Sequence, residues 1–103
     1  MSDDIIKLGG NIQLTGFSEV DKSSMIVIKK IVGNYVRKFS DKCRKFENLS
    51  LLVKPIHITE GSMIYEMHAK AISEGKPVVG EITERNIFTA VDSALKKIES
   101  SLC

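Results

Sequence analysis

Apolar residues between Lys22 and Phe46 recur at steps of three and four, which is the spacing of one face of a helix. The residues that fall within one sector of this helix are Ile28, Val32, Tyr35, Phe39, Cys43 and Phe46. Gly33 lies toward the opposite side, where it is either tolerated or marks the close approach of a partner. We therefore expect a long amphipathic helix over about residues 22–46, around which the rest of the chain is arranged.

A second helical pattern occupies the C-terminal part of the sequence. Asn86 is a suitable N-cap, and apolar residues follow it at helical spacing. They are Ile87, Val91, Ala94, Leu95, Ile98 and Leu102. Each expected helix hides a single apolar stripe, so both should pack on a sheet from the same side.

Four segments alternate between apolar and polar residues, which is the pattern of half-buried strands. They are residues 11–17, 49–56, 63–72 and 77–83. Residues 1–10, which end in two glycines, are expected to form a tail that frays, with a short extra strand as the alternative. Residues 11–103 should then form a single domain.

The order of these elements, β-α-β-β-β-α, predicts an α+β fold. The strands before and after the first helix should be parallel, because a helix carries the chain across between them. The later connections are short, so the last three strands should form an antiparallel meander. We expect a two-layer sandwich in which a four-stranded mixed sheet has both helices on one face.

Charge is distributed unevenly along the chain. Residues 22–46 hold eight Lys and Arg against one acid, Asp41, for a net charge of +7. The remainder holds seven Lys and Arg against twelve acids, a net −5, so the total of +2 conceals the asymmetry. Lys30, Arg37 and Arg44 are spaced by seven and line up behind the apolar face of the first helix. This distribution points to a polyanionic partner.

Composition and cysteine usage place the protein in a broad class. Of its 103 residues, 43% are apolar and 27% are charged, which is typical of a globular domain. No apolar run approaches the ~20 residues that cross a bilayer, and the N-terminus lacks a signal-peptide core. Cys43 and Cys103 do not have the spacing of a disulfide framework. We expect a cytoplasmic protein in a reducing compartment, with no membrane partner.

The C-terminal run Asn86–Ile98, together with the order of elements, resembles the ribosome hibernation promoting factor family, also called the ribosome-associated inhibitor or protein Y family. The residues of this region that fit the family pattern are Phe88, Ala90, Val91, Asp92, Lys97, Ile98 and Leu102. Leu14-Thr15-Gly16 and Leu52-Val53-Lys54 resemble its first and second strands. The resemblance is to the short form of the family. It implies docking on the small ribosomal subunit, in the channel for mRNA and tRNA, and inhibition of translation as in ribosome hibernation, a stress response.

A helix with a basic back can lie along a phosphate backbone, where arginine can bind one phosphate through two parallel hydrogen bonds. The residues predicted to contact RNA are Lys29, Lys30, Arg37, Lys38, Arg44 and Lys45, with Lys96 and Lys97 extending the patch on the second helix. No aromatic platform for stacking bases is evident, so recognition should depend on the shape of a structured ribosomal RNA.

Three other interpretations compete with this one. The basic helix can be simply a solvated surface, although solvating surfaces normally mix both signs of charge. The chain can be a general double-stranded RNA binder, although residues 86–93 lack the basic start expected of its second helix. It can also be a protein–protein adaptor that uses the exposed sheet face or a strand edge.

Catalytic and metal chemistry find little support in the sequence. His57 and His68 lie on adjacent expected strands without facing each other, and no third ligand has metal spacing. Cys43 fits a buried apolar residue better than a nucleophile, and Asp92 fits a helix start better than a catalytic acid. We therefore expect a non-enzymatic protein with no cofactor, metal or small-molecule substrate.

Overall fold

The computed structural model describes residues 5–9, 11–59 and 61–103, in which two strands, a helix, three strands and a second helix follow one another. These elements are β1 (Ile5–Leu8), β2 (Ile12–Thr15), α1 (Lys22–Lys42), β3 (Phe46–Thr59), β4 (Ser62–Ser73), β5 (Lys76–Glu84) and α2 (Ile87–Ser101). The predicted α+β class is therefore confirmed.

The five strands form one mixed sheet in the order β1-β2-β3-β4-β5. β2 and β3 are parallel, with Leu14 opposite Leu51, and helix α1 makes the crossover between them. β3, β4 and β5 are successively antiparallel, and Ala69 lies between Leu51 and Gly80. The expected parallel pair and antiparallel meander are thus both present.

The prediction of four strands is wrong, because β1 adds a fifth at the edge of the sheet. β1 runs antiparallel to β2, with Ile6 opposite Leu14 and Leu8 opposite Ile12. Ile6 and Leu8 pack against the core, so pairing also buries apolar surface that a frayed tail would leave in water. The expectation of a tail thus fails for Ile5–Leu8, where the alternative of a short strand holds, and residues 1–4 and 10 lie outside the described residues.

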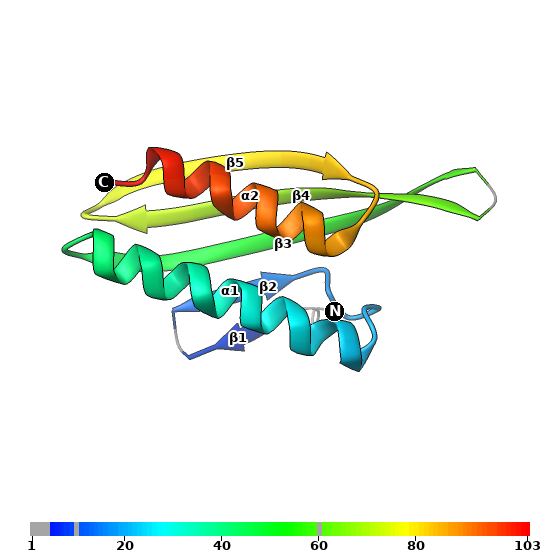
Figure 1. The fold of residues 1–103 in the computed structure, drawn as a ribbon, viewed down its shortest axis with the longest axis horizontal. Coiled ribbons are helices and arrows are strands. Elements are labelled where there is room, and N and C mark those ends of the chain that lie inside the picture. Colours follow the sequence, from blue (N-terminus) through cyan, green and yellow to red (C-terminus); the bar gives the residue numbers. More distant parts are fainter. Residues whose placement is uncertain (1–4, 10, 60) are drawn as a thin grey trace.

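Both helices cover the same face of the sheet and lie side by side (Figure 1). The largest side chains buried between helices and sheet include Phe17, Phe39, Leu49, Met67 and Leu95. Residues 50, 52 and 54 of β3 point to the opposite face, as do residues 66, 68 and 70 of β4. The other face of the sheet is therefore uncovered by the two helices.

Helix α1 begins where a capping side chain is available and ends earlier than predicted. The Asp21 carboxylate accepts hydrogen bonds from the Ser24 backbone N–H (3.0 Å) and hydroxyl (2.7 Å). The helix ends at Lys42, because Cys43 has an extended backbone and Phe46 already belongs to β3. Cys43 is buried and Phe46 is half-buried against the core, so the apolar pattern continues past the last helical turn. Helix α2 starts after the predicted cap, Asn86, which accepts from two backbone N–H groups.

The hairpin of β3 and β4 extends past the N-terminal ends of the helices as a two-stranded arm (Figure 1). The molecule is consequently elongated, with principal extents of 46, 25 and 24 Å. Ile56 and Ile58 on this arm are 40% and 52% exposed. The arm is thus a projecting structure with apolar side chains in solvent.

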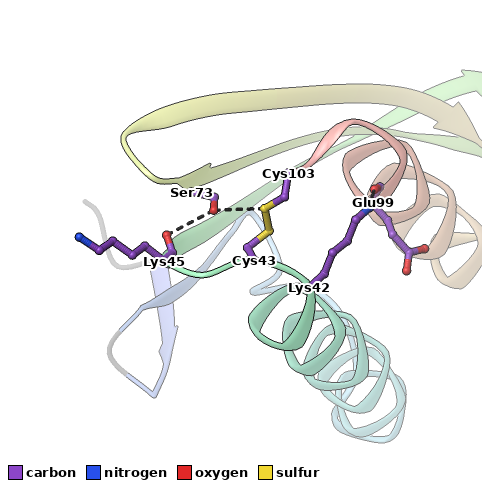
Figure 2. Close-up of a disulfide and its surroundings, with 6 residues drawn as sticks. All are labelled: Lys42, Cys43, Lys45, Ser73, Glu99 and Cys103. Atoms are coloured by element: carbon purple, nitrogen blue, oxygen red, sulfur yellow. Dashed lines mark hydrogen bonds between the residues drawn. A yellow bond between two sulfur atoms is a disulfide. The ribbon is translucent and has the colours of Figure 1, made fainter.

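A disulfide joins Cys43, directly after α1, to Cys103, two residues after α2 (Figure 2). The inference that these two cysteines form no disulfide framework is therefore wrong. Their separation of 60 residues carries no local signal, and only the parallel placement of the two helix ends brings their Cα atoms to 5.7 Å. The argument for a reducing compartment that rested on these cysteines no longer holds. Among the described residues, no helix is long and apolar enough to cross a membrane.

Candidate nucleic-acid interface

All eight cations predicted to contact RNA are exposed, but they occupy three different places. Lys29, Lys30, Arg37 and Lys38 lie on α1. Arg44 and Lys45 lie in the turn between α1 and β3 rather than on the helix. Lys96 and Lys97 lie on α2. We call the predicted cations of α1 and its following turn the basic surface, which consists of Lys29, Lys30, Arg37, Lys38, Arg44 and Lys45.

The geometry of α1 sets the direction of each helical cation. Its buried stripe runs through Met25, Ile28, Val32, Tyr35 and Phe39. Helical spacing then puts Lys30 and Arg37 directly opposite that stripe, with Lys29 and Lys38 on the two flanks. The Lys38 ammonium lies 5.1 Å from the centre of the Tyr35 ring, a cation–π distance that turns it toward α2.

The cations of the basic surface are not neutralised by contact with acids. Over residues 5–9, 11–59 and 61–103, the ion pairs within 4.0 Å are those of His68 with Glu66 and Glu81, on the uncovered face of the sheet. Asp41, the single acid of the basic segment, is exposed and takes no part in them. The basic surface therefore presents its charge to solvent.

Three hydrogen bonds hold the turn that carries Arg44 and Lys45. The Lys45 carbonyl accepts from the Glu74 backbone N–H at 2.9 Å and from the Ser73 hydroxyl at 3.3 Å. The Cys43 backbone N–H donates to the Phe39 carbonyl at 2.9 Å and caps the helix. Both ends of the turn are thus tied, so Arg44 and Lys45 extend from an anchored backbone.

Of the two α2 lysines, Lys97 turns away from the basic surface, and acidic residues of α2 lie toward α1. The Tyr35 hydroxyl donates to Asp92 Oδ1 at 2.9 Å, and Lys42 Nζ donates to the Glu99 carbonyl at 2.7 Å. Asp92 and the Glu99 carbonyl therefore face α1, and the negative charges of Asp92 and Glu99 act on Tyr35. Lys97 turns the other way, where its ammonium donates to the Glu81 carbonyl of β5 at 2.9 Å.

The seam between the helices also changes the acidity of Tyr35. Burial raises the pKa of Tyr35 to about 12, and the hydrogen bond to Asp92 and the negative charges of Asp92 and Glu99 act in the same direction. The phenol is consequently neutral at ordinary pH and remains a donor to Asp92. This bond fixes the position of α1 relative to α2.

Two apolar residues of α1 were not predicted to take part in binding. Ile26 and Val27 are 59% and 44% exposed, on the same side of the helix as Lys30. The sequence could have indicated their exposure, because both residues are apolar but fall outside the apolar sector of the helix. They give the N-terminal half of the basic surface an apolar border that can contact a partner's sugars, bases or side chains.

The uncovered sheet face holds a shallow depression of about 430 Å³, lined in part by Leu52, His68, Val79 and Glu81. His68 lies between two carboxylates, with Nδ1 3.3 Å from Glu81 Oε2 and Nε2 3.5 Å from Glu66 Oε2. His57 faces Met63 rather than His68, as predicted. Within the described part of the chain, no three metal-binding side chains gather at one place.

Neither a scan against protein-family models nor a search of curated proteins finds a match for this chain. The likeness to the hibernation factors therefore remains a resemblance carried by the residues quoted above.

Proposed function

We propose that the protein binds structured RNA through the basic surface, and that its target is the small ribosomal subunit. Binding there would inhibit translation without any catalytic step. The observation that carries this proposal is the set of six exposed cations along α1 and its turn, which have no carboxylate within 4.0 Å among the described residues.

The physical basis is the release of counterions from RNA. A phosphate backbone holds a condensed layer of cations, and each lysine or arginine that replaces one of them contributes favourable entropy. Lys30, Arg37 and Arg44 repeat every seven residues, so those on the helix project along one line. A rigid row of charges suits a folded RNA, whose phosphates are themselves held in place.

The ribosome is proposed as the target on the strength of the family resemblance. The order β-α-β-β-β-α that carries part of this resemblance is present in the fold, with β1 added before it. The capping Asn86 and the buried Val91 and Ile98 of the resembling run have structural roles in α2. A ribosome-binding protein of this kind would act in the cytoplasm.

Cosedimentation with purified small ribosomal subunits at rising salt tests the proposal. With about six phosphate contacts, the logarithm of the affinity should fall with the logarithm of salt at a slope of about −4 to −5. Naked RNA duplex at the same concentration is the matched control. Equal binding to duplex and subunit would indicate a general double-stranded RNA binder, and no binding to subunits at low salt would contradict the proposal.

The arm favours a second candidate function, that of a protein–protein adaptor. Ile56 and Ile58 project into solvent beyond the helices, and past Leu52 the described part of β3 pairs with β4 alone. An extended peptide could add to such an edge through backbone hydrogen bonds. A complex of this kind would be insensitive to salt and to charge reversal at Lys30, Arg37 and Arg44.

A further inference from the structure

The end of α1 that carries Arg44 and Lys45 is also the place where the disulfide closes. Figure 2 shows Cys43, Lys45, Ser73 and Cys103 gathered where α1, the β4–β5 turn and the end of α2 meet. The Ser73 hydroxyl lies 3.3 Å from the Lys45 carbonyl and 3.5 Å from Cys103 Sγ. A serine hydroxyl has one proton, so it can donate to only one of these two acceptors at a time.

In the oxidised protein the Ser73 proton is available to the Lys45 carbonyl. A disulfide sulfur is a weak, uncharged acceptor, and the carbonyl is the stronger of the two. Reduction changes this competition, because the thiolate fraction of a free Cys103 accepts a shorter and stronger, charge-assisted hydrogen bond. Ser73 then turns from Lys45 toward Cys103, and the turn that holds Arg44 and Lys45 loses one of its ties.

The backbone at Cys103 gives an independent sign that the disulfide holds it in place. Its φ is +52°, in the left-handed region that non-glycine residues rarely occupy. Such a conformation persists only where the surroundings impose it. Leu102, the neighbouring residue, is 1% exposed and stays packed whatever the state of the sulfurs. Breaking the disulfide therefore detaches Cys103 from Cys43, while the buried Leu102 keeps it at the end of α2, beside Ser73.

We propose that Cys43, Cys103 and Ser73 form a thiol–disulfide switch that sets how firmly the basic surface is held at Arg44 and Lys45. The low-molecular-weight thiol couple of glutathione and glutathione disulfide is its reaction partner. The oxidised state is the one that binds RNA more tightly. This inference rests on the proposed function, since it concerns regulation of the same surface.

The two cysteines have different parts in the exchange. Cys103 is exposed, whereas Cys43 is 5% exposed, so glutathione disulfide reaches Cys103 first. The Cys103 thiolate attacks glutathione disulfide, forms a mixed disulfide and releases one glutathione thiolate. The Cys43 thiolate then attacks the Cys103 sulfur, closes the protein disulfide and releases the second glutathione. The protein loses two electrons and two protons, and glutathione disulfide becomes two glutathione thiols.

The test measures the affinity of the chain for small ribosomal subunits after equilibration in reduced and in oxidised glutathione at about pH 8.5, where about half of an ordinary cysteine is thiolate. Alkylation of free thiols followed by intact-mass measurement reports the redox state in the same samples. The reduced protein should bind about threefold to tenfold more weakly, which is the cost of ordering one long side chain on binding. Equal affinity of fully reduced and fully oxidised protein would overturn the proposal, as would failure of the disulfide to form in glutathione disulfide.

Two variants separate the switch from a general effect of reductant. C103S should have the same affinity in both buffers, because it can neither form the disulfide nor present a thiolate to Ser73. S73A should still form the disulfide but lose most of the difference between the two states, because the hydroxyl that couples them is gone. A full redox difference retained in S73A would contradict the coupling role of Ser73.

Amide hydrogen exchange tests the thiol–disulfide switch independently of RNA binding. Reduction should speed exchange at the Glu74 N–H, which donates to the Lys45 carbonyl, and at the Cys43 N–H at the end of α1. Loss of subunit binding in both redox states together with this faster exchange would reject RNA binding and support the switch. Unchanged exchange at both amides would reject the switch whatever the RNA result.

Discussion

Gly16 and Gly33 differ in whether their positions can accommodate a side chain. Gly16 has φ +87°, and a Cβ there would collide with the Val53 carbonyl of the neighbouring strand. Gly33 lies in the exposed part of α1, and a Cβ there would meet nothing within 4 Å. The first glycine is required by a close backbone approach, and the second only lowers the stability of a helix.

We expect G16A to lower the free energy of unfolding by at least 1–3 kcal/mol, which is the cost of a forced left-handed conformation, with the clash added to it. G33A, the matched control, should raise it by about 0.5–1 kcal/mol. Urea denaturation followed by circular dichroism measures both. A neutral G16A would contradict the strand packing described here, and a G33A protein that is stable but binds RNA poorly would show that a partner approaches Gly33 closely.

Tyr35 links the two helices through a bond that depends on pH. Its pKa is raised to about 12 by burial and by Asp92, whereas an unfolded tyrosine titrates near 10. The neutral phenol is thus favoured in the folded state. Its contribution to stability is complete below pH 10 and is lost as the pH rises from 10 toward 12.

Y35F removes the hydrogen bond to Asp92 and, with it, the phenol group that titrates. It should lower the free energy of unfolding by about 1 kcal/mol, because Asp92 loses a donor. It should also reduce the fall in stability between pH 10 and 12 compared with the unmodified chain. Thermal unfolding at several pH values measures this slope, and an identical slope in both proteins would contradict the assigned bond.

At the scale of elements, local patterns predicted six of the seven helices and strands, and they missed β1 and the end of α1. The stripe from Ile28 to Phe39 and the cap at Asn86 were predicted, because helical spacing and capping are local properties. β1 was expected as a tail, since its four residues gain stability only by pairing with β2. The end of α1 was placed too late, since Cys43 and Phe46 continue the apolar spacing after the helix has stopped.

The sequence predicted the exposure of the candidate site residues better than their arrangement. The exposure of all eight cations follows from the pattern, because each lies off an apolar stripe. The direction of Lys97, toward β5 and away from α1, does not follow from the pattern, since it depends on which side of α2 faces α1. The disulfide likewise requires knowledge of two helix ends that are 60 residues apart in the chain.

The disulfide is also the element-scale feature with the largest expected effect on stability. In the chain-entropy description, a crosslink that closes a loop of this length stabilises the folded state by about 4 kcal/mol. We expect dithiothreitol to lower the free energy of unfolding by this amount and to leave C103S unaffected. Urea denaturation with and without reductant tests this, and equal midpoints for oxidised and reduced protein would contradict a closed Cys43–Cys103 bond.

At the scale of the whole molecule, charge and apolar surface are separated between regions. The basic surface lies on the helical layer, the ion-paired His68 lies on the uncovered sheet face, and the exposed isoleucines of the arm project past one end (Figure 1). The uncovered face also carries exposed lysines, among them Lys7, Lys54 and Lys70. Both faces thus carry exposed lysines. A variant that only changes the net charge cannot identify the binding face, whereas charge reversals placed on one face at a time can.

The most direct measurement compares two triple variants that change the net charge equally, by binding to small ribosomal subunits at fixed low salt. K30E/R37E/R44E reverses the basic surface, and K7E/K54E/K70E reverses three lysines of the uncovered face. We predict a loss of roughly 100-fold or more for the first, with a salt slope shallower by about 3, and a loss of less than about tenfold for the second. Equal losses for both variants would show that binding follows net charge alone, and would contradict the central claim that α1 and its turn are the RNA-binding surface.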